Sequence, residues 1–286
     1  MFGLEGMPVT LSIDRTNWKW GKKDIEILML SAVYRGTALP LFWMLLPKRG
    51  NSNTDERIKI MKRFIRCFGK ENIDCLLGDR EFVGEDWFAW LVEQEIHFCP
   101  RIKGNFVREN EYGIECLMRQ QFHNLNRGET RIIREKSKVL GQRLYLSALR
   151  LMSAEFLIFV SDRLLDVPIS LYGKRWEIET LFGCLKERDY NFEDTHVTNP
   201  KRIASLIALL SVAFCWSNRT DEWRHVHKPI IVRKHDRPSF SFFRYGLDYL
   251  RDRAPHYARH VDEEPDVCLN FLKKPPVITE IFRATA

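Results

Sequence analysis

The most informative stretch of this chain is Tyr172-Gly-Lys-Arg-Trp-Glu-Ile-Glu-Thr-Leu-Phe-Gly-Cys-Leu-Lys186, because chemically useful side chains recur along it at helical spacing. Those side chains are Tyr172, Arg175, Glu179 and Lys186. On a continuous α-helix, at about 100° per residue, all four lie within roughly 60° of one another. The apolar residues point away from that stripe, and they predict a core-facing side: Ile178, Phe182 and Leu185.

The predicted stripe places a carboxylate between cations, a combination that suits phosphate chemistry. The Glu179 carboxylate can hold a divalent metal ion, while Arg175 and Lys186 bind neighbouring phosphates. A plain structural interpretation stays open beside it. Arg175 and Glu179 form an i,i+4 pair, and such pairs commonly do no more than support an exposed helix.

Two aspartates each close an apolar run that reads as a β-strand. Asp14 ends Val9–Asp14, in which apolar residues alternate with period two. Asp79 ends Ile73–Asp79, a nearly continuous apolar run typical of a buried central strand. An Asp at a strand end is often only a turn or cap residue, and that alternative stays open for each of them.

The three carboxylates together predict more than each one alone. If the two strands are neighbours and the helix crosses beside them, Asp14, Asp79 and Glu179 form an oxygen-only site suited to Mg²⁺ or Mn²⁺. Two such ions about 4 Å apart support in-line displacement at a phosphodiester.

These residues resemble the signature of a known family, the DDE transposases of bacterial insertion sequences, of the insertion sequence 4 type. The family spacing is Tyr, two residues, Arg, three residues, Glu, six residues, Lys, and the 172–186 stretch matches it. Asp14-Arg15-Thr16 and Gly78-Asp79-Arg80-Glu81-Phe82 resemble the first and second aspartate motifs. The resemblance covers roughly residues 9–217.

The resemblance implies an α/β fold, a ribonuclease-H-like mixed sheet flanked by helices, that works with two divalent ions, Mg²⁺ or Mn²⁺. It places Asp14, Asp79 and Glu179 as catalytic metal ligands. Residues around them are expected to contact DNA, and these are Tyr172, Arg175, Lys186 and Arg80.

The pattern of elements is consistent with that core. Strands are expected at 9–14, 25–34, 38–46, 73–79 and 96–102, and helices at 53–68 and 84–94. Gly104 to Leu151 changes to short charged alternations and is expected to be a β-rich insertion between the second Asp and the catalytic Glu. The predicted organisation is therefore a discontinuous core, 1–103 and 152–217, an insertion, 104–151, and a basic, aromatic tail, 218–286.

Phe156 lies where family members that open DNA through a hairpin tend to use a tryptophan to hold a flipped base. No Trp lies between Trp90 and Trp176. A phenylalanine can also stack on a base, so Phe156 is a candidate DNA contact. Its other interpretation, as an ordinary core residue, stays open.

Composition favours a polyanionic partner: the 286 residues carry a formal net charge of +7 and the pI is near 9.0. The seven cysteines show no paired spacing, so neither a disulfide framework nor a zinc site is predicted. The most apolar segment, Ile203–Trp216, is expected to be a core helix and not a membrane span. No signal peptide is evident at Met1–Pro8, and a cytoplasmic bacterial protein, nucleoid-associated when bound to DNA, is expected.

Only thirteen residues precede Asp14, whereas transposases of this type usually carry an amino-terminal DNA-binding domain there, so a truncated catalytic core is expected. The leading hypothesis is Mg²⁺-dependent cleavage and strand transfer on double-stranded DNA, at the element's terminal repeats and its target, by a homodimer. A truncated, inactive remnant that only binds DNA or inhibits is the alternative. A general ribonuclease-H-like nuclease is a third.

Overall fold

The structure is a computed structural model that describes residues 2, 4, 6–20, 23–231, 241–259 and 267–272. The chain divides into two compact units. One is Gly6–Gly183, and the other combines Met1–Glu5 with Cys184–Ala286. The fold is mixed α/β, as predicted at that level. The predicted domain limits at 103/104, 151/152 and 217/218 differ from this division and stay predictions.

A four-stranded sheet forms the centre of the first unit. Its strands are β1 (Val9–Trp20), β2 (Lys23–Tyr34), β3 (Thr37–Leu46) and β4 (Ile73–Gly78), in the order β3-β2-β1-β4. β4 runs parallel to β1, and the other pairs are antiparallel. The β2–β3 hairpin turns at Arg35 and Gly36, both with positive φ (47° and 83°), which suits the right-handed twist of paired strands.

Helices α1 (Thr54–Phe68) and α2 (Glu85–Glu93) precede and follow β4, in the predicted order. Asn53 caps α1 through a reciprocal capping box with Glu56, which explains why the helix begins there. Arg57, Ile60, Met61 and Phe64 form the buried face of α1, and Ile58 and Ile65 are half-buried. Arg57 turns inward and bonds the loop before the helix.

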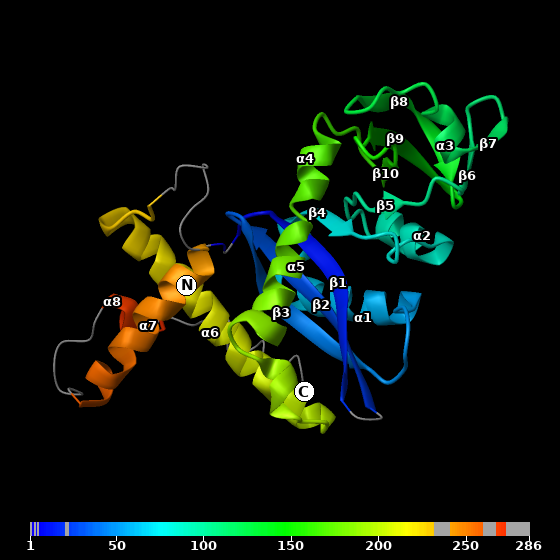
Figure 1. Ribbon diagram of the computed structural model, residues 1–286. Helices are drawn as coiled ribbons and strands as arrows, with labels where there is room; N and C mark the ends of the chain where they lie inside the picture. The colour runs from blue at the N-terminus through cyan, green and yellow to red at the C-terminus, as the bar shows by residue number, and fades with distance from the viewer. Residues whose placement is uncertain are drawn as a thin grey trace. The chain divides into compact units, whose positions relative to one another are not determined.

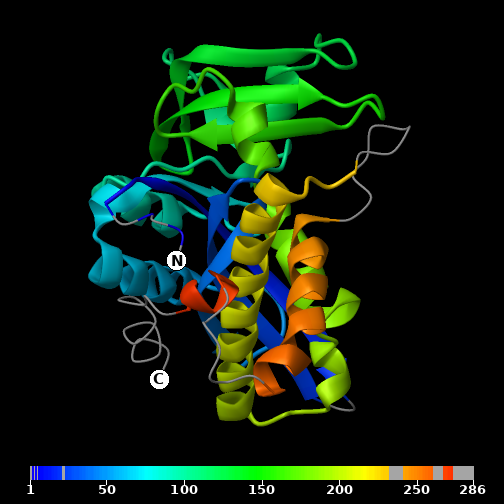
Figure 2. The same cartoon turned by 90° about the vertical axis from the view of Figure 1, so that its left-hand side faces the viewer.

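A six-stranded sheet completes the first unit, and Figure 2 shows it at one end of the four-stranded sheet. Its order is β5-β10-β9-β8-β6-β7, with bounds β5 (Arg101–Ile102), β6 (Val107–Glu109), β7 (Glu115–Leu117), β8 (Thr130–Val139), β9 (Gln142–Arg150) and β10 (Phe156–Ser161). Helix α3 (Met118–Gln121) lies between β7 and β8 in the chain. The strand expected at 96–102 is mostly irregular: it forms only a single bridge, Phe98 to Leu76, before β5.

Helix α4 (Pro168–Gly173) leads from β10 to α5 (Trp176–Gly183), and Figure 1 shows α5 crossing the four-stranded sheet. α5 packs on β1 and β3. Its apolar side is buried as the sequence predicts, at Ile178 and Phe182.

The second unit is helical among its described residues. A π-helix, Cys184–Arg188, and a 3₁₀ helix, Phe192–Thr195, precede α6 (Pro200–His227), α7 (Phe242–Arg259) and α8 (Val267–Asn270). α7 packs along α6 so closely that a Cβ on Gly246 would lie 1.9 Å from the carbonyl oxygen of Ser217. By length and composition α6 could cross a membrane, and 44 % of its most apolar window is buried in the structure, as in many core helices.

The predicted basic and aromatic tail corresponds in part to α7. Its rings are used inside the unit: the Arg224 guanidinium lies 3.8 Å from the ring centroid of Tyr245 and 5.0 Å from that of Tyr249. Within 218–286, positions 232–240, 260–266 and 273–286 lie outside the described residues. A DNA or dimer contact by this segment stays a prediction.

Candidate functional site

The two aspartates lie side by side where β4 ends. The parallel pairing of β1 with β4 runs to Ile13 opposite Gly78, so Asp14 and Asp79 are the next residues on adjacent strands. Asp79 follows the end of β4 as predicted, but the predicted end of the first strand at Asp14 is wrong. β1 continues to Trp20 because β2 pairs with it along the whole hairpin, to Lys23 opposite Trp20.

The signature segment is not the single helix that its spacing predicts. α4 ends at Gly173, and tight three-residue hydrogen bonds bridge the break: the Arg175 amide donates to the Tyr172 carbonyl at 2.9 Å, and the Ile178 amide to the Arg175 carbonyl at 3.2 Å. Gly173 favours such a break because glycine weakens a helix interior. Lys186 then falls in the π-helix, so the four signature residues do not share one regular stripe.

Arg175 occupies the centre of the site. Its Nη1 donates to Asp14 Oδ2 at 2.9 Å and its Nη2 to Glu179 Oε1 at 2.5 Å. The residue is 4 % exposed, and its guanidinium lies about as far from the Tyr172 ring, 5.6 Å, as from the Trp176 ring, 5.5 Å. A buried guanidinium thus joins a carboxylate of β1 to one of α5. Asp14 and Arg175 are 161 positions apart in the sequence.

Asp79 is held from the other side by Tyr172, whose hydroxyl donates to Asp79 Oδ1 at 3.4 Å. The Tyr172 ring packs on Phe159 of β10, with centroids 4.6 Å apart. Burial raises the pKa of the Tyr172 phenol well above its usual range, so the hydroxyl stays protonated and remains a donor.

The three predicted carboxylates act on one another electrostatically. Burial raises the pKa of Asp14 to about 6, the Arg175 charge and the Arg15 amide oppose that rise, and the charges of Asp79 and Glu179 add to it. Burial is thus the main cause of the shift, and the charges of Asp79 and Glu179 add a smaller repulsion that a bound cation would relieve.

Divalent ions fit the chemistry of these donors, since hard cations prefer carboxylate oxygens. In the arrangement described here, no three His, Cys, Asp or Glu side chains among the described residues stand close enough to hold one ion together. At this site the Arg175 guanidinium takes the place of a cation, because it bonds both Asp14 and Glu179 and supplies the positive charge between them.

The other predicted contacts are placed differently. Arg80 is exposed directly beside Asp79. Phe156 is half-buried at the start of β10, where the Arg150 guanidinium lies 5.3 Å from its ring centroid. Lys186 belongs to the second unit, where its Nζ lies 3.0 Å from Glu193 Oε1. The roles of these three residues in binding DNA stay predictions.

Sequence reasoning missed several charged residues next to the site. Arg101 of β5 acts on the Tyr172 hydroxyl and pairs with Glu155 at 2.6 Å. Arg15 and Glu81, each within two residues of a predicted ligand, bond one another at 3.1 Å. Because Arg15 and Glu81 lie inside the two aspartate motifs, the sequence offered a signal for them. It offered no such signal for Arg101.

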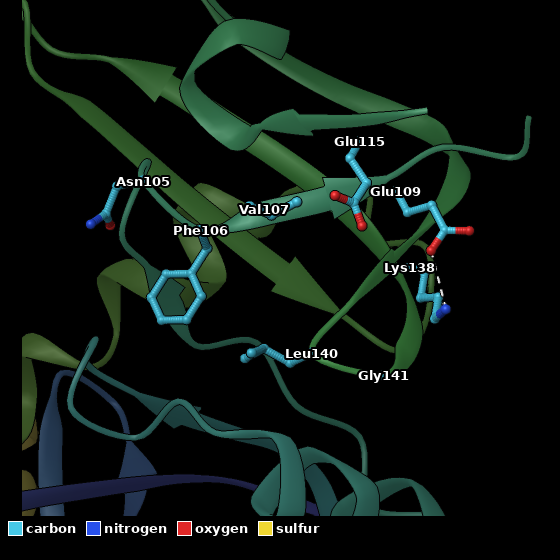
Figure 3. Close-up of a pocket in the computed structure, with 8 residues that line it drawn as sticks. All are labelled: Asn105, Phe106, Val107, Glu109, Glu115, Lys138, Leu140 and Gly141. Carbon is cyan, nitrogen blue, oxygen red and sulfur yellow. Dashed lines mark hydrogen bonds and ion pairs between the residues drawn. The ribbon is translucent and has the colours of Figure 1, made fainter. Parts of the chain in front are cut away.

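A separate hollow of about 520 Å³ lies among β6, β7 and the β8–β9 turn, shown in Figure 3. Phe106 and Leu140 line one part of it, and at the other the Lys138 Nζ lies 3.1 Å from Glu109 Oε2. None of the predicted site residues lines this hollow. The carboxylate site around Arg175 is therefore the better candidate for catalysis.

A family model described as the transposase DDE domain matches residues 5–216. That match covers most of the chain and spans both aspartates and the segment with Glu179. The chain belongs to the transposase DDE-domain family, whose members are transposases and generally use divalent metal ions.

Among solved structures, the chain is similar to the piggyBac transposase in a synaptic complex with hairpin DNA. The identity is 12 % and the TM-score 0.45, over 95 % of this chain and 57 % of that one. The chain thus spans little more than half of the length of that transposase. A search of curated proteins found no match.

Proposed function

We propose that this chain is the catalytic core of an insertion-sequence transposase of the insertion sequence 4 type. It cleaves double-stranded DNA at the ends of its element and joins the freed ends to target DNA. The observation that carries the proposal is that one guanidinium bonds both Asp14 and Glu179, while Asp79 follows the strand paired with β1 and accepts from Tyr172. All of these residues lie inside the segment that matches the family. The strand order β3-β2-β1-β4, with α5 across it, supports a ribonuclease-H-like core.

In this proposal Asp14, Asp79 and Glu179 hold two divalent ions, Mg²⁺ or Mn²⁺. When bound, such ions activate a nucleophilic oxygen and stabilise the leaving oxygen of an in-line displacement. The ligands come from three elements, β1, the end of β4 and α5, and the parallel pairing of β1 with β4 supports the placement of Asp14 beside Asp79.

The surrounding residues bind and orient the DNA. Arg175 presents a planar fork that matches two phosphate oxygens, so it can exchange a carboxylate partner for a phosphate. Tyr172 keeps its proton and orients Asp79 through a hydrogen bond. Arg80 is exposed beside Asp79 and adds a further positive charge for the backbone of the DNA.

Water attacks first and opens the phosphodiester at the element end, which frees a 3′ hydroxyl. That hydroxyl then attacks a phosphodiester of the target, so one site performs both displacements. Two copies of the chain bring the two ends together, which makes a homodimer on DNA the proposed assembly.

Nicking of labelled duplex DNA tests the proposal. The duplex carries the sequences that border this gene's element, and reactions contain Mg²⁺ or Mn²⁺ with the intact protein, with Glu179→Ala, or with Asp79→Asn. We expect nicks at the element end that need the metal ion and disappear in both variants. Binding without cleavage in all three proteins would instead identify a remnant that only binds DNA, and cleavage of RNA–DNA hybrids without end preference a general nuclease.

A further inference from the structure

A network of four buried or half-buried charges lies under the sheet edge that carries Asp14 and Asp79. It contains two cations and two carboxylates, so its charge is balanced. Glu26 and Arg57 are each at most 5 % exposed, and the Arg15 and Glu81 side chains are 17 % and 16 % exposed. None of the four belongs to the predicted set of site residues.

Arg15 is the link from β1. It follows Asp14 directly, and its Nε donates to both Glu81 oxygens, at 3.1 and 3.2 Å. Its Nη1 donates to Glu26 of the neighbouring strand β2. Because successive side chains of a strand point to opposite faces, Arg15 leaves the sheet on the side away from the Asp14 carboxylate.

Glu81 is the link from β4, two residues beyond Asp79. The Asp79–Phe82 turn closes with a bond from the Phe82 amide to the Asp79 carbonyl at 2.8 Å. The Glu81 carboxylate also accepts from the Ser52 amide at 3.1 Å. The turn after Asp79 is therefore tied both to β1 and to the loop before α1.

Arg57 of α1 is the fourth member of the network. It donates to the Ser52 carbonyl at 2.6 Å and to the Glu81 carbonyl at 2.9 Å, and its guanidinium lies 5.2 Å from the Phe82 ring centroid. The turn has little room to shift, since a Cβ on Gly78 would approach Phe82 Cβ at 2.9 Å.

Buried ion networks contribute little net stability compared with well-packed apolar side chains, so a fixed geometry is the better explanation for this one. We infer that Glu81 is a positioning residue which, through its bonds to Arg15 and Ser52, fixes the separation of the Asp14 and Asp79 carboxylates for divalent-ion binding. The inference rests on the proposed function. Arg15 leaves the sheet on the face opposite Asp14 and bonds Glu81 there, so both act on the carboxylates through the backbone.

Mn²⁺ titration of the intact protein by calorimetry, together with thermal unfolding followed by circular dichroism, tests the inference. Loss of a partner that orients a metal ligand typically weakens metal binding about 10- to 100-fold, and we expect that weakening for Glu81→Gln, with a cooperative unfolding transition retained. Glu81→Asp, which keeps the charge, should recover part of the affinity. The control is Glu95→Gln, which removes an exposed ion pair with Lys70 at 2.5 Å and should bind Mn²⁺ like the natural protein.

A second variant covers the case in which Glu81→Gln does not fold. Arg15→Lys keeps the charge but loses the planar fork that reaches Glu81 and Glu26 together, so it should bind Mn²⁺ about tenfold more weakly. If Glu81→Gln folds and binds Mn²⁺ as tightly as the natural protein, the inference is overturned and the proposed function is left intact. If Glu81→Gln does not fold, the same Mn²⁺ affinity in Arg15→Lys has that consequence. If the natural protein binds Mn²⁺ no better than Asp14→Asn, the proposed function and the inference both fail.

Discussion

Replacement of Arg175 by alanine should destabilise the protein in a way that divalent ions repair. Arg175 is buried and bonds Asp14, whose side chain is 15 % exposed, and Glu179, whose side chain is 42 % exposed. Its loss therefore leaves the largely buried Asp14 carboxylate without its cation, while water can screen Glu179. Breaking a buried ion pair by removing one partner costs about 3–5 kcal/mol, and protonation of Asp14 returns part of it, so we expect a net loss of about 3 kcal/mol. For a unit of this size that loss lowers the melting temperature by about 6–12 °C.

The change in melting temperature on adding a divalent ion tests this explanation. An ion at about 100 times its dissociation constant stabilises the folded state by about 2.7 kcal/mol. In Arg175→Ala no guanidinium competes for the carboxylates, so Mn²⁺ should raise the melting temperature more than it does in the natural protein. Lys174→Ala, which removes an exposed neighbouring cation, is the matched control and should change neither value. Equal metal-induced shifts in natural protein and Arg175→Ala would refute the reasoning.

Three further predictions concern single groups. The pKa of Asp14 is raised to about 6 from an ordinary 3.8, so the metal-free folded state binds a proton more tightly than the unfolded state does. The free energy of unfolding therefore falls by up to about 3 kcal/mol as the pH rises from about 4 to about 6. Urea unfolding across that range should show a flatter profile for Asp14→Asn, and parallel profiles would contradict it. Burial raises the pKa of Glu177 to about 7, and its Oε2 has no hydrogen-bond partner among the described residues. Glu177→Gln should therefore stabilise the protein by about 1 kcal/mol near pH 8, where the carboxylate is charged, and hardly at all near pH 5. The same gain at both pH values in urea unfolding would show that charge is not the cause. Gly246→Ala should cost about 3 kcal/mol in denaturant unfolding, because its Cβ would meet the Ser217 carbonyl oxygen at 1.9 Å. Gly84→Ala, whose Cβ would meet only Trp87 Cβ at 3.8 Å, is the control, and equal stabilities would contradict the close approach of α7 to α6.

Local pattern was enough for much of the framework. The apolar patterns predicted strands at 25–34 and 38–46 and a helix at 53–68, close to the observed bounds of β2, β3 and α1. The apolar run before Asp79 predicted β4 and its end. These features depend on neighbours in the sequence, so the sequence carries them directly.

Other features were predicted wrongly because distant segments decide them. β1 passes Asp14 because β2 offers it hydrogen bonds as far as Lys23. The helix expected at 172–186 breaks after Gly173, and the break lets Arg175 turn into the site and bond Asp14. Helical spacing alone cannot report a break that a tertiary contact stabilises.

The sequence by itself determined the family, the order of the core elements and the residue types of the candidate site, because these depend on spacing along the chain. Only the tertiary structure decided that Arg175 stands between two carboxylates and that Arg15 and Glu81 tie the aspartate segments together. The physical reason is that an ion pair depends on separation in space. Asp14 and Arg175 are 161 positions apart, and only the packing of α5 on β1 brings them within 2.9 Å.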